Sequence, residues 1–76
     1  MNTKVDTHVF ANSSNILRVD YDNLTNVLIV YFRSGSIYQF VDVPYKIFED
    51  FKICESARKF FTVNIKNKFE FVKRVK

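Results

Sequence analysis

The stretch from residue 27 to residue 43 constrains the fold more than any other part of the sequence. β-branched and aromatic residues fill positions 27–32 and 37–41, and Arg33-Ser34-Gly35 separates the two runs with the only glycine of the chain. Two runs of this kind around a short segment with glycine are typical of a β-hairpin. We therefore take this hairpin as the centre of the fold.

The length of the hairpin loop decides which side chains share a face. A two-residue loop would put the alternate apolar residues of the two arms on opposite faces. A three-residue loop, with Gly35 at a positive φ, puts them on one face and creates a core, so we predict this form. The residues of that face are Leu28, Val30, Phe32, Tyr38 and Phe40.

The segments on either side of the hairpin add a strand and two helices. Residues 16–21 alternate with period two, with Leu17, Val19 and Tyr21 on the apolar side. Pro44 suits the first position of a helix, and Ser56 suits the cap of a second one. The apolar side of the first helix is Pro44, Ile47, Phe48, Phe51 and Cys54, and that of the second is Ala57, Phe60, Phe61 and Ile65.

These elements predict an α+β fold, with a three- to four-stranded antiparallel meander sheet followed by two helices packed on one face. The 76 residues allow a single domain over 1–76. Residues 1–8 are polar and without periodicity, so we expect them to be disordered. Residues 69–76 return to near-alternation and predict an edge strand or a basic arm.

The sequence favours a soluble cytoplasmic protein that is not an enzyme. No apolar run approaches the ~20 residues that cross a bilayer, and the N-terminus does not resemble a secretory signal. Cys54 is the only cysteine and His8 the only histidine, so neither a disulfide nor a cysteine-rich metal site is expected. Asp20 and Asp22 lack the remaining ligands of a calcium loop. We expect no catalytic residue, no metal and no cofactor.

Charge is distributed unevenly along the chain. Residues 1–55 hold five Lys/Arg and seven Asp/Glu, whereas residues 56–76 hold seven Lys/Arg and one Glu, so the net charges are −2 and +6. A clustered positive charge attracts phosphate backbones or acidic protein surfaces. A solvated lysine-rich face is the alternative explanation.

The second face of the hairpin is also apolar. Val27, Ile29, Tyr31, Ile37 and Val41 form it, and an exposed patch of this size would be unusual on a monomer. We expect the C-terminal arm to cover this face through Phe69, Phe71 and Val75, which favours a monomer. A second copy in a homodimer or a protein partner are the alternatives.

The chain resembles the KTSC domain, a short module at the C-terminus of some lysyl-tRNA synthetases that also occurs as a free-standing bacterial or phage protein. The resemblance covers about residues 12–70 and implies a small α+β fold, a role near RNA and no established catalytic activity. One departure is Ser56-Ala57-Arg58, where the family usually has Ser-Lys-Gly. The residues that carry the resemblance are Ser14, Ile16, Tyr21, Asp22, Leu28, Val30, Phe32, Gly35, Tyr38, Phe40, Val43, Pro44, Ser56, Phe61 and Ile65.

Two functions are consistent with these features. The first is binding of RNA or another nucleic acid through the basic last third of the chain, with Tyr45 or Tyr31 as a stacking residue. The second is a protein-interaction or inhibitor module that uses the second sheet face, Val27, Ile29, Tyr31, Ile37 and Val41, or binds an acidic protein partner. The basic candidates for the first are Arg58, Lys59, Lys66, Lys68, Lys73 and Arg74.

Overall fold

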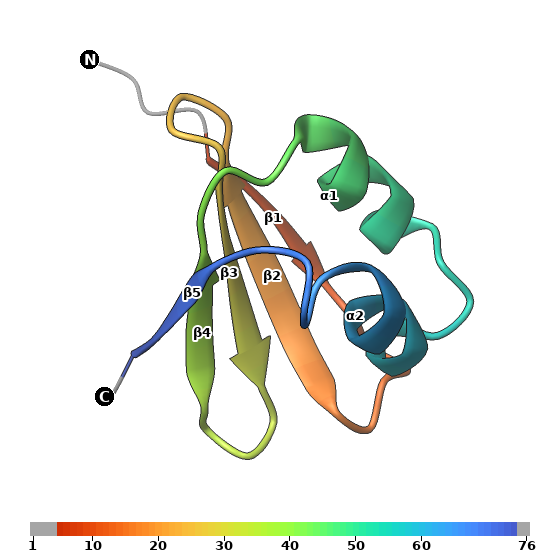
Figure 1. Cartoon of the computed structure of the whole chain (residues 1–76). Coiled ribbons are helices and arrows are strands. Elements are labelled where there is room, and N and C mark those ends of the chain that lie inside the picture. The colour runs from red at the N-terminus through yellow and green to blue at the C-terminus, as the bar shows by residue number, and fades with distance from the viewer. Residues whose placement is uncertain (1–4, 75–76) are drawn as a thin grey trace.

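The computed structural model describes residues 5–74 and has an α+β fold (Figure 1). All five strands form one antiparallel sheet in the order β1-β2-β3-β4-β5, one strand more than the upper end of the prediction. The two helices lie between β4 and β5 in the sequence and pack on the same face of the sheet. The elements are β1 (Val5–Val9), β2 (Ile16–Asp22), β3 (Val27–Phe32), β4 (Ile37–Phe40), α1 (Tyr45–Lys52), α2 (Ala57–Asn64) and β5 (Phe71–Arg74).

The predicted hairpin and its three-residue loop are confirmed in β3 and β4. The Phe32 amide donates to the Ser36 carbonyl at 2.9 Å, which closes the loop around residues 33–35. Gly35 has a φ of 102°, as the register argument requires. Leu28 then pairs with Phe40 and Val30 with Tyr38, so the apolar residues of both arms share one face.

Strand β2 differs from its predicted pattern at one end. The pairing with β3 shifts between Ile16 and Arg18, which is a β-bulge. The extra residue reverses the alternation, so Ile16 is fully buried while Leu17 is 39% exposed. The prediction that Leu17 faces the core is therefore wrong.

Strand β1 corrects the expectation for the N-terminal end of the chain, whereas β5 is an edge strand of the kind expected for the C-terminal end. The expectation of disorder over residues 1–8 is wrong for Val5 to His8, which pair with residues 19–22 of β2, and residues 1–4 lie outside the described residues. Strand β5 pairs with β4 and extends the sheet at its other edge. It does not lie across the second face, and Phe71 packs instead on Phe40 on the helix side. Val75 lies outside the described residues.

The helices begin close to the predicted positions. Pro44 is the residue before the first turn of α1 rather than its first residue. Ser56 caps α2 as predicted, because its Oγ accepts from the Lys59 amide at 3.2 Å. Phe48 and Phe51 of α1 and Ala57 and Phe61 of α2 are buried against the sheet.

Tyr21 lies at the centre of one end of the core. Its side chain is fully buried and stacks on Phe48, with 5.3 Å between ring centroids. Its hydroxyl donates to the Val43 carbonyl at 2.6 Å and lies 3.1 Å from Asn26 Oδ1. These contacts join the β2–β3 turn to the segment that leads into α1, because one phenol reaches both. Among the described residues, no helix is long and apolar enough to span a bilayer.

Candidate functional site

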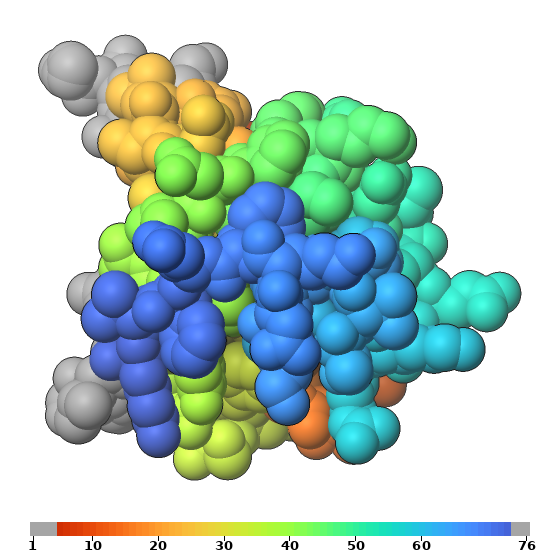
Figure 2. Space-filling view, viewed as in Figure 1, coloured from red at the N-terminus to blue at the C-terminus, as the bar shows by residue number. Residues whose placement is uncertain are grey.

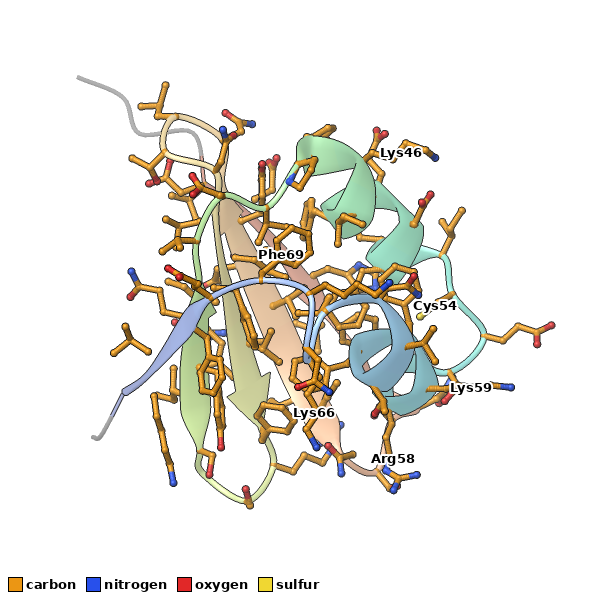
Figure 3. All side chains as sticks on the ribbon, in the orientation of Figure 1. Lys46, Cys54, Arg58, Lys59, Lys66 and Phe69 are labelled. Carbon is orange, nitrogen blue, oxygen red and sulfur yellow. The ribbon has the colours of Figure 1, made fainter. Side chains whose placement is uncertain are left out.

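Basic side chains gather at the end of the sheet that carries the β3–β4 loop, which we call the basic end. The register puts Lys73 of β5 opposite Tyr38, near this loop. Lys66 follows α2 and lines a cleft with Ser34 and Ser36 of the loop. Arg58 lines a cavity with residues 12–14, which precede β2 at the same end. Figure 3 shows Arg58 and Lys66 on this lower side of the molecule. Arg58, Lys66 and Lys73 are all exposed.

Acidic residues lie mainly toward the opposite end of the sheet. Asp22 closes β2 there, where it pairs with Val5 and Val27. Asp42 and Glu70 are next to the paired ends of β4 and β5. Helix α1, which carries Glu49 and Asp50, lies over the same upper part of Figure 1. The molecule therefore has a charge asymmetry along its strands, with the positive pole at the basic end.

Arg33 also lies at the basic end, but two of its side-chain donors are already used. Its Nε donates to the Ser13 carbonyl at 2.6 Å, and an Nη donates to the Phe10 carbonyl at 3.0 Å. Its backbone amide donates to the Asn15 carbonyl at 2.9 Å. Arg33 therefore fixes the segment before β2 against the hairpin loop, and it contributes its charge to the pole while the edge of its guanidinium that carries Nε is occupied.

The remaining predicted nucleic-acid residues do not all converge. Lys59 lies on the outer side of α2, in a shallow depression with Phe60 and Val63. Lys68 is exposed on the turn beside Glu70. Arg74 belongs to β5 and pairs with Ile37 at the basic end. Tyr45 packs on Tyr21, 5.6 Å between ring centroids, at the far end of the sheet from the β3–β4 loop.

A cleft of about 410 Å³ opens beside the basic end, and sequence reasoning did not single it out. In Figure 2 it is the hollow where yellow-green hairpin atoms are visible between β5 and the lighter blue segment around the end of α2. We call it the aromatic cleft. The residues that line it are Asn15, Phe32, Ser34, Ser36, Tyr38, Phe40, Phe61, Lys66, Asn67 and Phe71.

The sheet face opposite the helices is covered by no other described segment. Val27, Ile29, Tyr31, Ile37 and Val41 are all half-buried there. The prediction that the C-terminal arm covers them is wrong, because β5 pairs edge to edge with β4. We call this surface the open sheet face.

Polar groups are interspersed on the open sheet face. The Arg18 guanidinium lies 4.1 Å from the centroid of the Tyr31 ring and 3.7 Å from Asp20 Oδ2. Asp20 also accepts from the Thr7 hydroxyl at 2.7 Å. The Tyr31 side chain and the Asp20 carboxylate raise the pKa of Arg18 further above its ordinary value.

Cys54 and His8 line one cavity of about 610 Å³ between β1 and the α1–α2 connection. The sequence did not predict that these two side chains lie close together, because His8 was expected to be disordered. Burial raises the pKa of the Cys54 thiol, and its Sγ donates to the Phe51 carbonyl at 3.0 Å. The thiol form therefore dominates at neutral pH, and a thiol is a poor nucleophile. Within residues 5–74 no three His, Cys, Asp or Glu side chains gather as metal ligands.

The comparisons with known proteins agree with this architecture. A search of curated proteins returned no match. The crystal structure of a KTSC domain protein from Yersinia pestis matches with a TM-score of 0.85 and 32% sequence identity, over 95% of this chain and 100% of that one. The KTSC domain model matches residues 12–69. The chain therefore belongs to the KTSC domain family.

Proposed function

We propose that this protein is a non-enzymatic RNA-binding domain that holds the phosphate backbone at the basic end. The observation that carries the proposal is the charge asymmetry, with Arg58, Lys66 and Lys73 exposed near one loop and most carboxylates at the other end. Positive charge clustered in this way attracts a polyanion and orients the protein on it.

The exposed cations of the basic end are available to a ligand. In the described part of the chain the ion pairs are Arg18–Asp20 and Lys46–Asp50, and neither involves Arg58, Lys66 or Lys73. Each lysine or arginine that contacts a phosphate releases a condensed counterion, which makes binding weaken with salt. The resemblance to a module carried by some lysyl-tRNA synthetases favours RNA over DNA.

The proposal has two further parts: the protein has no catalytic activity, and it is cytoplasmic. Burial keeps the Cys54 thiol protonated, which supports a binding role over a nucleophilic one. A single unpaired cysteine needs no oxidising compartment and supports a cytoplasmic protein.

Fluorescence anisotropy with a labelled RNA tests this function. We expect the affinity to fall steeply between about 50 and 200 mM salt. Combining Arg58→Glu, Lys59→Glu and Lys66→Glu should abolish binding and leave the circular dichroism spectrum unchanged, because these side chains are exposed.

The sharpest comparison uses two single variants with the same change of charge. Lys66→Glu should weaken binding and reduce the salt slope by about 0.7, the value for one phosphate contact on a single strand. Lys46→Glu is the control, because Lys46 is exposed on α1 away from the basic end. Equal effects of the two variants would mean that net charge alone acts, and no salt-dependent binding would refute the function.

A second candidate function is recognition of a protein partner by the open sheet face. The observation that favours it is that this face presents Val27, Ile29, Tyr31, Ile37 and Val41 with no described cover. Arg and Tyr are enriched among the residues that dominate binding energy at interfaces, and Arg18 and Tyr31 are in contact on this face.

We expect the free protein to be a monomer, because Arg18, Asp20 and Thr7 interrupt the apolar surface. Light scattering across a dilution series measures this directly. A dimer that persists on dilution and that Ile29→Asp dissociates would show that a second copy occupies the face. Leu24→Asp, at an exposed turn position, is the matched control.

A further inference from the structure

We propose that the aromatic cleft takes one unpaired base of the RNA strand, so that the ligand is single-stranded RNA rather than a duplex. The inference rests on the proposed function, because it adds a base-binding pocket to the phosphate-binding basic end. It assigns a role to Phe32, Tyr38 and Phe71, none of which the sequence singled out as a binding residue.

The cleft has an aromatic wall that a ligand can reach. Phe71 is 48% exposed, and Phe32 and Tyr38 are half-buried, whereas Phe40 and Phe61 are 1% and 8% exposed and close its floor. Its volume of about 410 Å³ lies in the range of small-ligand pockets. The accessible rings come from three neighbouring strands, β3, β4 and β5, so the sheet fixes their spacing.

The rings are held in place before any ligand arrives. Phe32 meets Tyr38 edge to face at 5.5 Å and Phe61 at 5.3 Å. Tyr38 also packs on Phe71 at 5.2 Å between ring centroids. Side chains locked by such contacts lose little conformational entropy on binding, which favours affinity for a flat ligand.

The rim carries the groups that a nucleotide needs. Asn15 and Asn67 offer amide donors and acceptors, and Ser34 and Ser36 offer hydroxyls, which match the polar edge of a base. Lys66 supplies a positive charge at the same rim, suited to the phosphate that precedes or follows the base. Among the described residues that line the cleft there is no carboxylate, so a cationic ligand is disfavoured.

The aromatic faces can be reached only by a base that has left its stack. Bases in an RNA helix cover each other's faces, whereas loops and single strands offer bases that stack on aromatic side chains. A cleft bounded by α2 on one side and β5 on the other does not admit a double helix. The geometry therefore selects unpaired RNA.

The experiment compares a labelled single strand of mixed sequence with a duplex of equal length, using the wild-type protein. We expect the single strand to bind at least about 10-fold more tightly at the same salt concentration. Replacing one base by 2-aminopurine should give a fluorescence change on binding. This comparison needs no variant, so it does not depend on the folding of one.

Phe71→Ala tests the wall of the cleft, and Val72→Ala is its control on the same strand and opposite face. Both side chains are exposed, at 48% and 63%. Loss of a stacking partner should weaken single-strand binding roughly 5- to 100-fold and leave the salt slope unchanged. Val72→Ala should bind as the wild type does.

The outcomes separate the two proposals. Equal binding of single strand and duplex, with the Lys66→Glu effect intact, would overturn the base-binding cleft and leave the RNA-binding function standing. Unchanged single-strand affinity in a folded Phe71→Ala variant would overturn it as well. Binding of neither RNA would overturn both.

Discussion

Gly35 gives the most direct test of the hairpin register on which the core depends. Its φ is 102°, and no atom lies within 4 Å of where a Cβ would be added. A substitution there is therefore opposed by backbone strain alone, and not by a clash. Strain of this kind costs about 1–3 kcal/mol. The smaller entropy of the unfolded chain with alanine offsets about 0.4–1 kcal/mol of it.

We therefore expect Gly35→Ala to lower the free energy of unfolding by about 1–2 kcal/mol, and Gly35→Val to fall at or above the upper end, because a β-branched residue tolerates a positive φ poorly. For a domain of this size that corresponds to a melting temperature lower by about 4–8 °C per kcal/mol. Urea denaturation measures the change in the free energy of unfolding, and the m-value should equal that of the wild type. Gly35→Asn should cost less, because asparagine enters this region more readily.

Ser34→Ala is the matched control, because Ser34 is the exposed neighbour in the same loop and does not have a positive φ. It should change stability by less than about 0.5 kcal/mol. If Gly35→Val melts at the wild-type temperature, the loop does not require a positive φ, and the assignment of Tyr38 and Phe40 to the core face loses its basis.

Two further predictions concern the core and its edge. Tyr21→Phe should destabilise by about 1–3 kcal/mol, because the buried Val43 carbonyl loses its donor. Burial raises the pKa of the Tyr21 hydroxyl, so the stability that its protonated form adds to the folded state is present below about pH 10 and is lost as the pH rises above that value. The Tyr21→Phe variant should therefore lose less stability at alkaline pH than the wild type does in a pH series of thermal melts. Truncation after Lys68 should destabilise by about 2–4 kcal/mol in urea, because Phe69 and Phe71 no longer pack on the core.

The hairpin could be predicted from sequence because two local signals agree there. The period-two pattern of β3 and β4 and the single glycine of the loop specify the same register, and each depends on nearby residues only. The Ser56 cap of α2 was predictable for the same reason.

Features that depend on distant partners were not predictable in the same way. The bulge at Leu17 leaves the alternation of the sequence intact and becomes visible only when β2 is aligned with β3. Strand β1 is short and polar, and it forms because β2 offers an edge, with Thr7 bonded to Asp20. A polar segment of this kind resembles a disordered terminus until its partner is known.

The candidate site shows a similar division. The exposed cations were predictable, since charged side chains off an apolar stripe lie in solvent. The aromatic cleft was not, because Phe32, Tyr38 and Phe71 follow the spacing of core residues. Whether such a ring is covered depends on where α2 ends on the sheet, and periodicity contains no information about that position.

The antiparallel meander converts the uneven distribution of charge along the sequence into a charge asymmetry between the two ends of the sheet. Neighbouring strands run in opposite directions, so the loop between β3 and β4 meets the start of β2 and the later part of β5 at one end of the sheet. Lys73 and Arg33, forty residues apart in the chain, therefore share that end. The turns after β2 and β4 meet at the other end and bring Asp22 and Asp42 there. In the RNA complex that we propose, a positive field at one pole and a negative one at the other would orient the phosphate backbone toward the aromatic cleft, so that electrostatic attraction and base stacking act on the same strand.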